Sequence, residues 1–495
     1  MIRAPAIQRA DRSMLVLAGV AALVVGVLAA ATSPLIPLGA LFGVLVLGLI
    51  WWRPIVGVGL FVAVVAVLPF GVIPVPLAGA QPTFVDALLI ATFTAVLARR
   101  IFTGAPVPLD ATGVALIGFV LVCIAAFVAG GSGSPVTPEM IRRTGKLLAS
   151  LLFFLIARSV LNSPDRLASA TRWLILAGAF QGAVGTLLSR LPPLDQLTLL
   201  TRLQVIGYPT DNVLRYVPGA NETYTNQLRA IGTSVDPNVF GGTLMLALVV
   251  TVVQWASPQP VFRKSVLVLL AIPTALGMVL SLSRASWVGL GVGLLFIGAA
   301  RYRRILVLAA LGGVAVLLAP VGQAFVLRFV SGFSIADPAT AFRVGEYANA
   351  LTLLGRYPLL GIGFGASPDI DVTAGVSSVY LLVAEQTGLV GLAVYVTALL
   401  TTWLVGLKAL DRVKEPRLQG IVAACLAAFT GALVTGLLDH YFANQAFPHA
   451  VALFWLYAAV LVGASRSGGL SARQTEPERA AEPRPTALGA HAPTV

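Results

Sequence analysis

Three cations stand at the start of a predicted helix, where positive charge is electrostatically unfavourable. The segment 137–139 (Thr-Pro-Glu) has the residue types of an N-cap and first turn, so we expect a helix to begin there. Arg142, Arg143 and Lys146 then share one face of its first turns. Cations at this end oppose the positive end of the helix dipole, and one glutamate cannot offset three of them. This arrangement predicts a bound anion, such as a phosphate.

Arg284 repeats the anomaly at a second predicted helix start. Ser283 can cap that helix, which leaves Arg284 at the first helical position. Helix starts carry free backbone N–H groups that attract anions, so an added guanidinium favours phosphate binding. The alternative for all four cations is that their side chains extend to the phosphates of membrane lipids.

Acidic and imidazole side chains near the same predicted helix ends could move protons. Asp86 and Glu385 lie in apolar stretches, where a carboxylate is costly unless it is paired or functional. Asp236, before Pro237-Asn238, could be a functional group or only a helix cap. His440 and His449 flank the last predicted outer turn, either as a general base or as hydrated loop histidines.

The composition requires a membrane to position these groups. Hydrophobic residues make up 58% of the 495 residues, charged residues 11%, and the mean hydropathy is +0.91. Such a chain is an all-α polytopic membrane protein. About fourteen stretches have the roughly 20 apolar residues that a span needs. They lie near residues 14–31, 35–52, 55–73, 84–98, 111–130, 140–158, 167–188, 238–256, 266–282, 284–300, 305–321, 378–407, 419–438 and 446–464.

Lys and Arg placement predicts the orientation. With the N-terminus inside, every inner connection carries at least one Lys or Arg, as the positive-inside bias requires. We therefore expect a multi-pass protein of the inner membrane with both termini cytoplasmic. The predicted parts are a cytoplasmic segment 1–13, spans 1–11 over 14–321, an outer loop 322–377, spans 12–14 over 378–464, and a disordered cytoplasmic tail 465–495.

The remaining composition excludes several other classes. Membrane orientation already explains the net charge of +13, so no nucleic-acid partner is expected. Cys123 and Cys425 fall inside predicted spans and form no CxxC pattern. We expect no metal and no cofactor.

The outer loop contains one predicted amphipathic helix. Asp337-Pro338 is a cap and first turn, and the helix should end before Pro358. Arg343, Glu346 and Asn349 share its polar face, and the expected apolar face is formed by Val344, Tyr347, Leu351 and Leu354. We expect this helix to lie on the outer membrane surface. The glycine-rich segment 361–365 that follows is interpreted as a tight turn, because no strand precedes it.

The order of these motifs resembles the O-antigen ligase and O-antigen polymerase family. The resemblance is carried by 283–287 (Ser-Arg-Ala-Ser-Trp), by Arg343 ahead of 357–365, and by Tyr380-Leu381 followed by 385–391 (Glu-Gln-Thr-Gly-Leu-Val-Gly). Asp236-Pro237-Asn238 and Asp86 are also similar to that family, and the likeness extends from about residue 80 to 460.

The resemblance implies a fold similar to GT-C membrane glycosyltransferases. It also implies an outer-face enzyme acting on glycans carried by undecaprenyl diphosphate, with Arg284 and Arg343 at the positions that contact the diphosphate. The acceptor would be another glycan or a lipid. Many ligases of the family have a His-Asn pair before the Tyr-Leu motif, where this chain has Ser377-Ser378. A polymerase, or a relative without that histidine, therefore fits better than a ligase.

We expect a metal-independent glycosyltransferase whose arginines stabilise the diphosphate leaving group. Arg284 and Arg343 are the expected catalytic cations, and Glu385, Glu346 and Asp236 are the candidates for accepting the proton of the acceptor hydroxyl. The predicted substrate-binding residues are Arg142, Arg143, Lys146, Tyr380 and Asp86. A flippase for lipid-linked oligosaccharides or another membrane transporter is the alternative, for which cations should line a path through the membrane depth.

Overall fold

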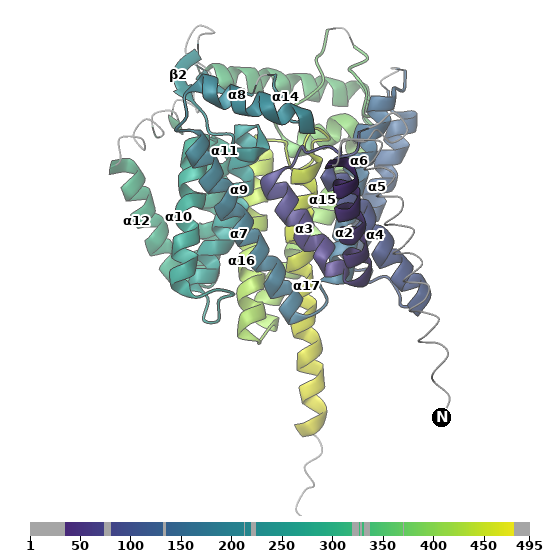
Figure 1. The fold of residues 1–495 in the computed structure, drawn as a ribbon, viewed down its shortest axis with the longest axis vertical. Coiled ribbons are helices and arrows are strands. Elements are labelled where there is room, and N and C mark those ends of the chain that lie inside the picture. The colour runs from purple at the N-terminus through teal and green to yellow at the C-terminus, as the bar shows by residue number, and fades with distance from the viewer. Residues whose placement is uncertain are drawn as a thin grey trace, which may run out of the picture.

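The protein is a helical bundle with further helices lying across one end (Figure 1). The computed structural model describes residues 35–73, 81–131, 135–211, 213–218, 224–318, 326, 329–330, 337–369 and 371–479. Its α-helices are α2 (Leu35–Trp52), α3 (Pro54–Val67), α4 (Phe84–Thr103), α5 (Ala111–Ala129), α6 (Pro138–Val160), α7 (Pro164–Leu188), α8 (Pro193–Leu203), α9 (Pro237–Ala256), α10 (Lys264–Ser281), α11 (Arg284–Ala300), α12 (Arg303–Leu318), α14 (Pro338–Arg356), α15 (Val379–Arg412), α16 (Pro416–Leu438) and α17 (Pro448–Arg479).

Sheet structure is limited to one small hairpin in the described part of the chain. Strands β1 (Tyr216–Pro218) and β2 (Tyr224–Leu228) pair antiparallel, with Tyr216 opposite Leu228. Short 3₁₀ turns, η1 (Gln204–Ile206) and η2 (Gly232–Ser234), lie before and after it. The expectation of an all-α membrane protein is therefore confirmed.

The predicted apolar stretches coincide with helices. The stretch at 14–31 lies outside the described residues, and each of the others, from 35–52 to 446–464, overlaps one helix. Six of the described helices, α5, α9, α10, α15, α16 and α17, are long and apolar enough to cross a membrane by length and composition. A count of fourteen spans thus stays a prediction.

Helices α9, α16 and α17 form the centre of the bundle. Most of each apolar segment is buried, and the large side chains Trp455, Phe429 and Phe240 are fully enclosed there. Small residues allow α11 to pack closely along α16: a Cβ added to Gly293 would lie 2.6 Å from the backbone oxygen of Ala427. Close contact of this kind is how helices associate where lipid weakens the hydrophobic drive. It fixes the start of α11 beside the end of α16.

A break in α15 is filled by the glycine-rich loop. Gly388 has φ 68°, so it leaves helical geometry inside α15. Backbone N–H groups of Ile362 and Gly363 donate to the carbonyls of Glu385 and Gln386, at 2.9 and 3.1 Å, and Leu389 N–H donates to the Pro358 carbonyl. Broken helices are tolerated in membranes when other backbone satisfies the exposed groups. The segment 361–365, expected to be a tight turn, thus fills the break in α15 and fixes the backbone of Glu385 by hydrogen bonds.

Candidate active site beneath α14

Helices α8 and α14 lie across one end of the bundle in Figure 1. Asp337 is the N-cap of α14, and its side chain accepts a hydrogen bond from Thr340 N–H, as predicted from Asp337-Pro338. The helix ends at Arg356, directly before Tyr357-Pro358. Its predicted bounds are therefore confirmed.

The orientation of α14 differs from the prediction. Phe342, Val344 and Leu351 are exposed, whereas Arg343, Glu346 and Tyr347 are partly buried against the bundle. The expected apolar face was therefore wrong in part, because Val344 and Leu351 point outward and Tyr347 points inward. The physical reason is that the bundle offers polar partners to this side of α14. A helix that turns charge toward a bundle covers a polar site.

Arg284 joins the start of α11 to the start of α14. It occupies the first position of α11, and its guanidinium donates to Asp337 Oδ2 at 3.0 Å. Burial raises the pKa of Asp337, but the charge and hydrogen bonds of Arg284, together with those of Thr340, outweigh burial and hold that pKa below its ordinary value. Asp337 is therefore an anion bound by Arg284 at a helix start.

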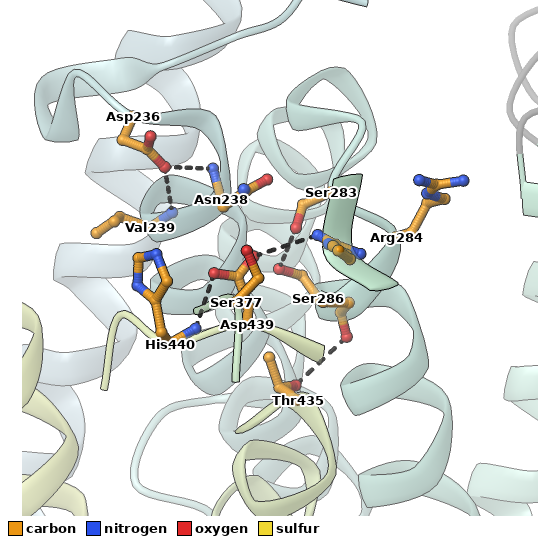
Figure 2. Close-up of polar contacts among 12 residues, drawn as sticks. Asp236, Asn238, Val239, Ser283, Arg284, Ser286, Ser377, Thr435, Asp439 and His440 are labelled. Atoms are coloured by element: carbon orange, nitrogen blue, oxygen red, sulfur yellow. Dashed lines mark hydrogen bonds and ion pairs between the residues drawn. The ribbon is translucent and has the colours of Figure 1, made fainter. Parts of the chain in front are cut away.

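Ser283 precedes Arg284 at the N-cap position but makes no capping hydrogen bond. Its hydroxyl instead accepts from the Ser286 hydroxyl at 2.9 Å, and both side chains are buried. Figure 2 shows this serine pair beside Asp439, with the guanidinium of Arg284 directed away from Asp439. The prediction that Ser283 caps the helix is thus right in position and wrong in its hydrogen bond.

Asp439 is the partner of the second arginine. It follows directly after α16, its side chain is 4% exposed, and its Oδ2 lies 3.8 Å from an Arg343 nitrogen. Oδ1 accepts from the N–H of His440, while Oδ2 has no hydrogen-bond partner within the part of the chain that the structure describes. Burial raises the pKa of Asp439 despite the nearby charges of His440 and Arg343. A buried carboxylate with an unbonded oxygen and raised pKa is suited to accept a proton.

The sequence prediction did not include Asp439 among the candidates. The signal was present, because an acidic residue stands immediately after the long apolar stretch 419–438 and before His440. His440 itself places Nδ1 3.1 Å from the Asn444 side-chain nitrogen. Figure 2 shows its ring between Val239 and Asp439, so His440 belongs to the same cluster.

Two of the predicted carboxylates hold one loop. Glu346 Oε2 accepts from Ser377 N–H at 3.1 Å, and Glu385 Oε1 accepts from Gly375 N–H at 2.8 Å. The buried Glu385 Oε2 has no hydrogen-bond partner among the described residues. Tyr347 adds a hydrogen bond to the Leu437 carbonyl at 2.9 Å. The segment 373–378, Glu346 and Glu385 therefore form one layer between α14 and the ends of α15 and α16.

Asp236 acts as a helix cap in the structure. One of its oxygens accepts from the N–H groups of Asn238 and Val239, at 2.8 and 3.0 Å (Figure 2). The side chain of Asn238 accepts from Arg229, which also donates to the Ser281 carbonyl. Arg229 thus ties the start of α9 to the end of α10, and the sequence analysis did not single it out.

The other predicted binding residues lie in separate contacts. Arg142 and Arg143 both pair with Glu139 at the start of α6, at 2.6 Å each, and are well exposed. Lys146 pairs with Asp86 of α4 at 2.7 Å, and Asp86 also completes a capping box with Thr83. These carboxylates are distinct from those that bind Arg284 and Arg343.

Tyr380 lies between α15 and α16. Its hydroxyl donates to the Leu433 carbonyl at 2.8 Å, and the side chain is partly buried.

In the described residues no group of three or more His, Cys, Asp or Glu could hold a metal ion.

Comparison with known proteins finds a family match over part of this chain. Residues 266–396 match the family model of the O-antigen ligases. The matched segment runs from α10 into α15 and contains Arg284, Arg343, Glu346 and Glu385. No curated protein matches the chain. The family resemblance expected from the sequence motifs is confirmed.

Proposed function

We propose that this chain, whose residues 266–396 belong to the O-antigen ligase family, is a glycosyltransferase that polymerises or transfers glycans carried on undecaprenyl diphosphate. The family supports a membrane protein with a glycan-transfer function. We place the reaction at the end of the bundle covered by α14. By the positive-inside bias, that end faces outward from the cytoplasmic membrane, and both termini are cytoplasmic.

One observation carries the proposal. Arg284 at the start of α11 and Arg343 on α14 each face a carboxylate from another element. A carboxylate bound to a guanidinium marks a position that a phosphate oxygen can also occupy, because the planar guanidinium can chelate either group. We propose that a diphosphate binds there, with Asp337 and Asp439 as the resident anions in its absence.

The arginines would act mainly on the leaving group. When the acceptor oxygen bonds to the anomeric carbon, the bond from that carbon to the diphosphate oxygen breaks and negative charge develops on the diphosphate. Fixed guanidinium groups stabilise this charge more than they stabilise the bound donor, which lowers the barrier. This single displacement inverts the anomeric centre, and the arginines supply the positive charge without a metal.

The proton of the acceptor hydroxyl would pass to Asp439. Its Oδ2 lies 3.8 Å from an Arg343 nitrogen and has no hydrogen-bond partner in the described residues. Glu385 is the second candidate, because its Oε2 is also unbonded. Asp236 and Glu346 instead hold backbone N–H groups in place.

The structure around Ser377 bears on the subtype. Many ligases of the family have a His-Asn pair at the position where this chain has Ser377-Ser378. The backbone N–H of Ser377 donates a hydrogen bond to Glu346. We propose a polymerase, or a relative that does not use that histidine. The acceptor would then be a second lipid-linked glycan.

Incubation of the purified protein with a lipid-linked repeat unit tests the function. We expect products of increasing length, and single transfer to a different lipid would indicate ligase activity instead. Movement of the donor between the two leaflets of a vesicle membrane, without formation of any new glycosidic bond, would contradict the proposal and favour a flippase.

A further inference from the structure

A cavity at the opposite end of the bundle collects cations from several helices. It has a volume of about 560 Å³ and is lined by Arg53, Arg99, Arg100 and Arg166, among other residues. Arg53 stands between α2 and α3, Arg99 and Arg100 lie near the end of α4, and Arg166 lies in the first turn of α7. Four arginines from several helix ends therefore line one space.

These cations have no acidic partner within the described ranges. Arg99 donates to the carbonyls of Trp51 and Trp52, and Arg100 donates to the Pro106 carbonyl. Arg166 donates to the Val160 carbonyl and to Asn162 Oδ1. The neighbouring carboxylate in the sequence, Asp165, pairs with Arg417 instead.

Other arginines at this end show the contrast. Arg158 is buried and pairs with Asp110 at 3.3 Å, so the fold supplies a carboxylate where burial demands one. Positive-inside orientation explains the presence of Arg at this end but not its convergence on one cavity, where like charges repel. A bound anion would remove that repulsion.

The cavity walls indicate what kind of anion fits. Trp52, Pro54, Ile55 and Val96 give it an apolar side, whereas Ser159 and Asn162 add uncharged polar groups. Trp52 is 65% exposed, and α4 continues the apolar surface with exposed Ile101 and Phe102. Exposed tryptophan and apolar helix faces are typical of the membrane interface. The combination fits a phosphate head with an acyl chain attached.

We propose that this cavity binds the phosphate group of an anionic membrane lipid from the leaflet on its side of the bundle. Guanidinium groups chelate phosphate oxygens, and basic pockets between membrane helices bind acidic lipid heads. Arg53 is the N-cap residue of α3 and Arg166 lies in the first turn of α7, and the positive end of a helix dipole also favours an anion. The site is independent of the proposed glycan transfer.

Lipid binding by the full-length protein tests the proposal. The purified chain is compared in phosphatidylcholine nanodiscs and in nanodiscs that also contain phosphatidylglycerol, with retained lipid counted by native mass spectrometry. The test variant is Arg53→Gln with Arg166→Gln, and the matched control is Arg303→Gln with Arg304→Gln, two exposed arginines at the start of α12. We expect the test variant to retain phosphatidylglycerol about tenfold less and the control to behave as wild type.

Two further variants separate charge from folding. Arg53→Lys with Arg166→Lys keeps the charge and should retain more phosphatidylglycerol than the Gln variant. Arg53→Gln alone breaks no hydrogen bond within the described part of the chain, so it reports binding if the double variant fails to fold.

Three results would overturn the proposal. They are equal retention of phosphatidylglycerol by Arg53→Gln and wild type, equal retention of phosphatidylcholine and phosphatidylglycerol by wild type, and displacement of phosphatidylglycerol by inorganic phosphate alone. The last result would assign the cavity to a soluble anion rather than to a lipid.

Discussion

Two groups of cations expected at outer helix ends differ in how the fold neutralises them. Arg142 and Arg143 share one exposed glutamate from their own helix, and Lys146 pairs with Asp86. Arg284 and Arg343 pair with carboxylates on other elements, and one of these carboxylates, Asp439, is buried. An unfavourable charge position in the sequence therefore identifies both groups, but only Arg284 and Arg343 pair with carboxylates at the start of α14 and beneath it.

The largest effect on glycan transfer is expected for Arg343, which faces the buried Asp439. Arg343→Ala should reduce glycan transfer about 10²- to 10³-fold, because a guanidinium aimed at the leaving group is lost. Polysaccharide length and amount in cells measure the loss, with membrane level checked by immunoblot. Arg142→Ala is the control, and equal polymer from both variants would show that the two groups do not differ.

Asp439→Asn should follow with a loss of about 10²-fold, because the amide cannot accept a proton. In the wild type, transfer should fall as pH drops through the pKa of Asp439, since only the carboxylate is active. Burial raises that pKa, so the fall should lie above the ordinary value of about 3.9. Rate against pH for the purified protein measures it, and an unchanged acidic limb in Asp439→Asn would assign the base elsewhere.

Gly388→Ala tests the packing of the glycine-rich loop into the break in α15, beside Glu385. A positive φ is strained for alanine, and its Cβ would collide with backbone of the 358–360 segment, so we expect a stability loss of about 2 kcal/mol or more. Gly355→Ala on α14 is the matched control, because an added Cβ there meets nothing within 4 Å. Thermal unfolding in detergent compares the two variants. Equal melting temperatures would show that the close packing at Gly388 does not contribute to stability.

Lys146→Gln should affect stability more than transfer. It leaves the partly buried Asp86 without its cation, which should cost about 1–3 kcal/mol. Transfer per folded molecule should stay within about twofold. A tenfold loss of transfer at unchanged stability would instead support the substrate-binding role predicted for Lys146 and Asp86 from the sequence.

The smallest effect is expected for Arg142→Gln with Arg143→Gln. Exposed ion pairs contribute about 0–1 kcal/mol, so both melting temperature and transfer should be close to wild type. A large loss of donor affinity, measured as a raised KM, would return these residues to the site.

Local sequence signals predicted the helices because the signals are themselves local. Long apolar stretches gave the helices from 35–52 onward, and Asp337-Pro338 gave both the cap and the start of α14. A capping role was one of the two alternatives predicted for Asp236, and the structure shows that cap. The sequence could predict it because a cap contacts only the next few residues.

The site required contacts that local signals do not contain. The inward side of α14 depends on Asp439 and on the 373–378 segment, which lie tens of residues away in sequence. The break at Gly388 depends on backbone from 358–363 entering α15, and the glycine motifs indicated turns without indicating that they meet. The role of Asp439 follows from its burial beside Arg343, a contact between segments far apart in the sequence that no local pattern contains.

The most direct test of the central claim uses the purified protein and a lipid-linked glycan donor. Single-turnover transfer is measured for wild type, Arg284→Lys, Arg343→Lys and the control Arg142→Lys. Lysine keeps the charge but loses the chelating geometry, so we predict wild-type rates for the control and a loss of most transfer for the other two. Wild-type rates in Arg284→Lys and Arg343→Lys would contradict the proposal that these guanidinium groups bind the diphosphate.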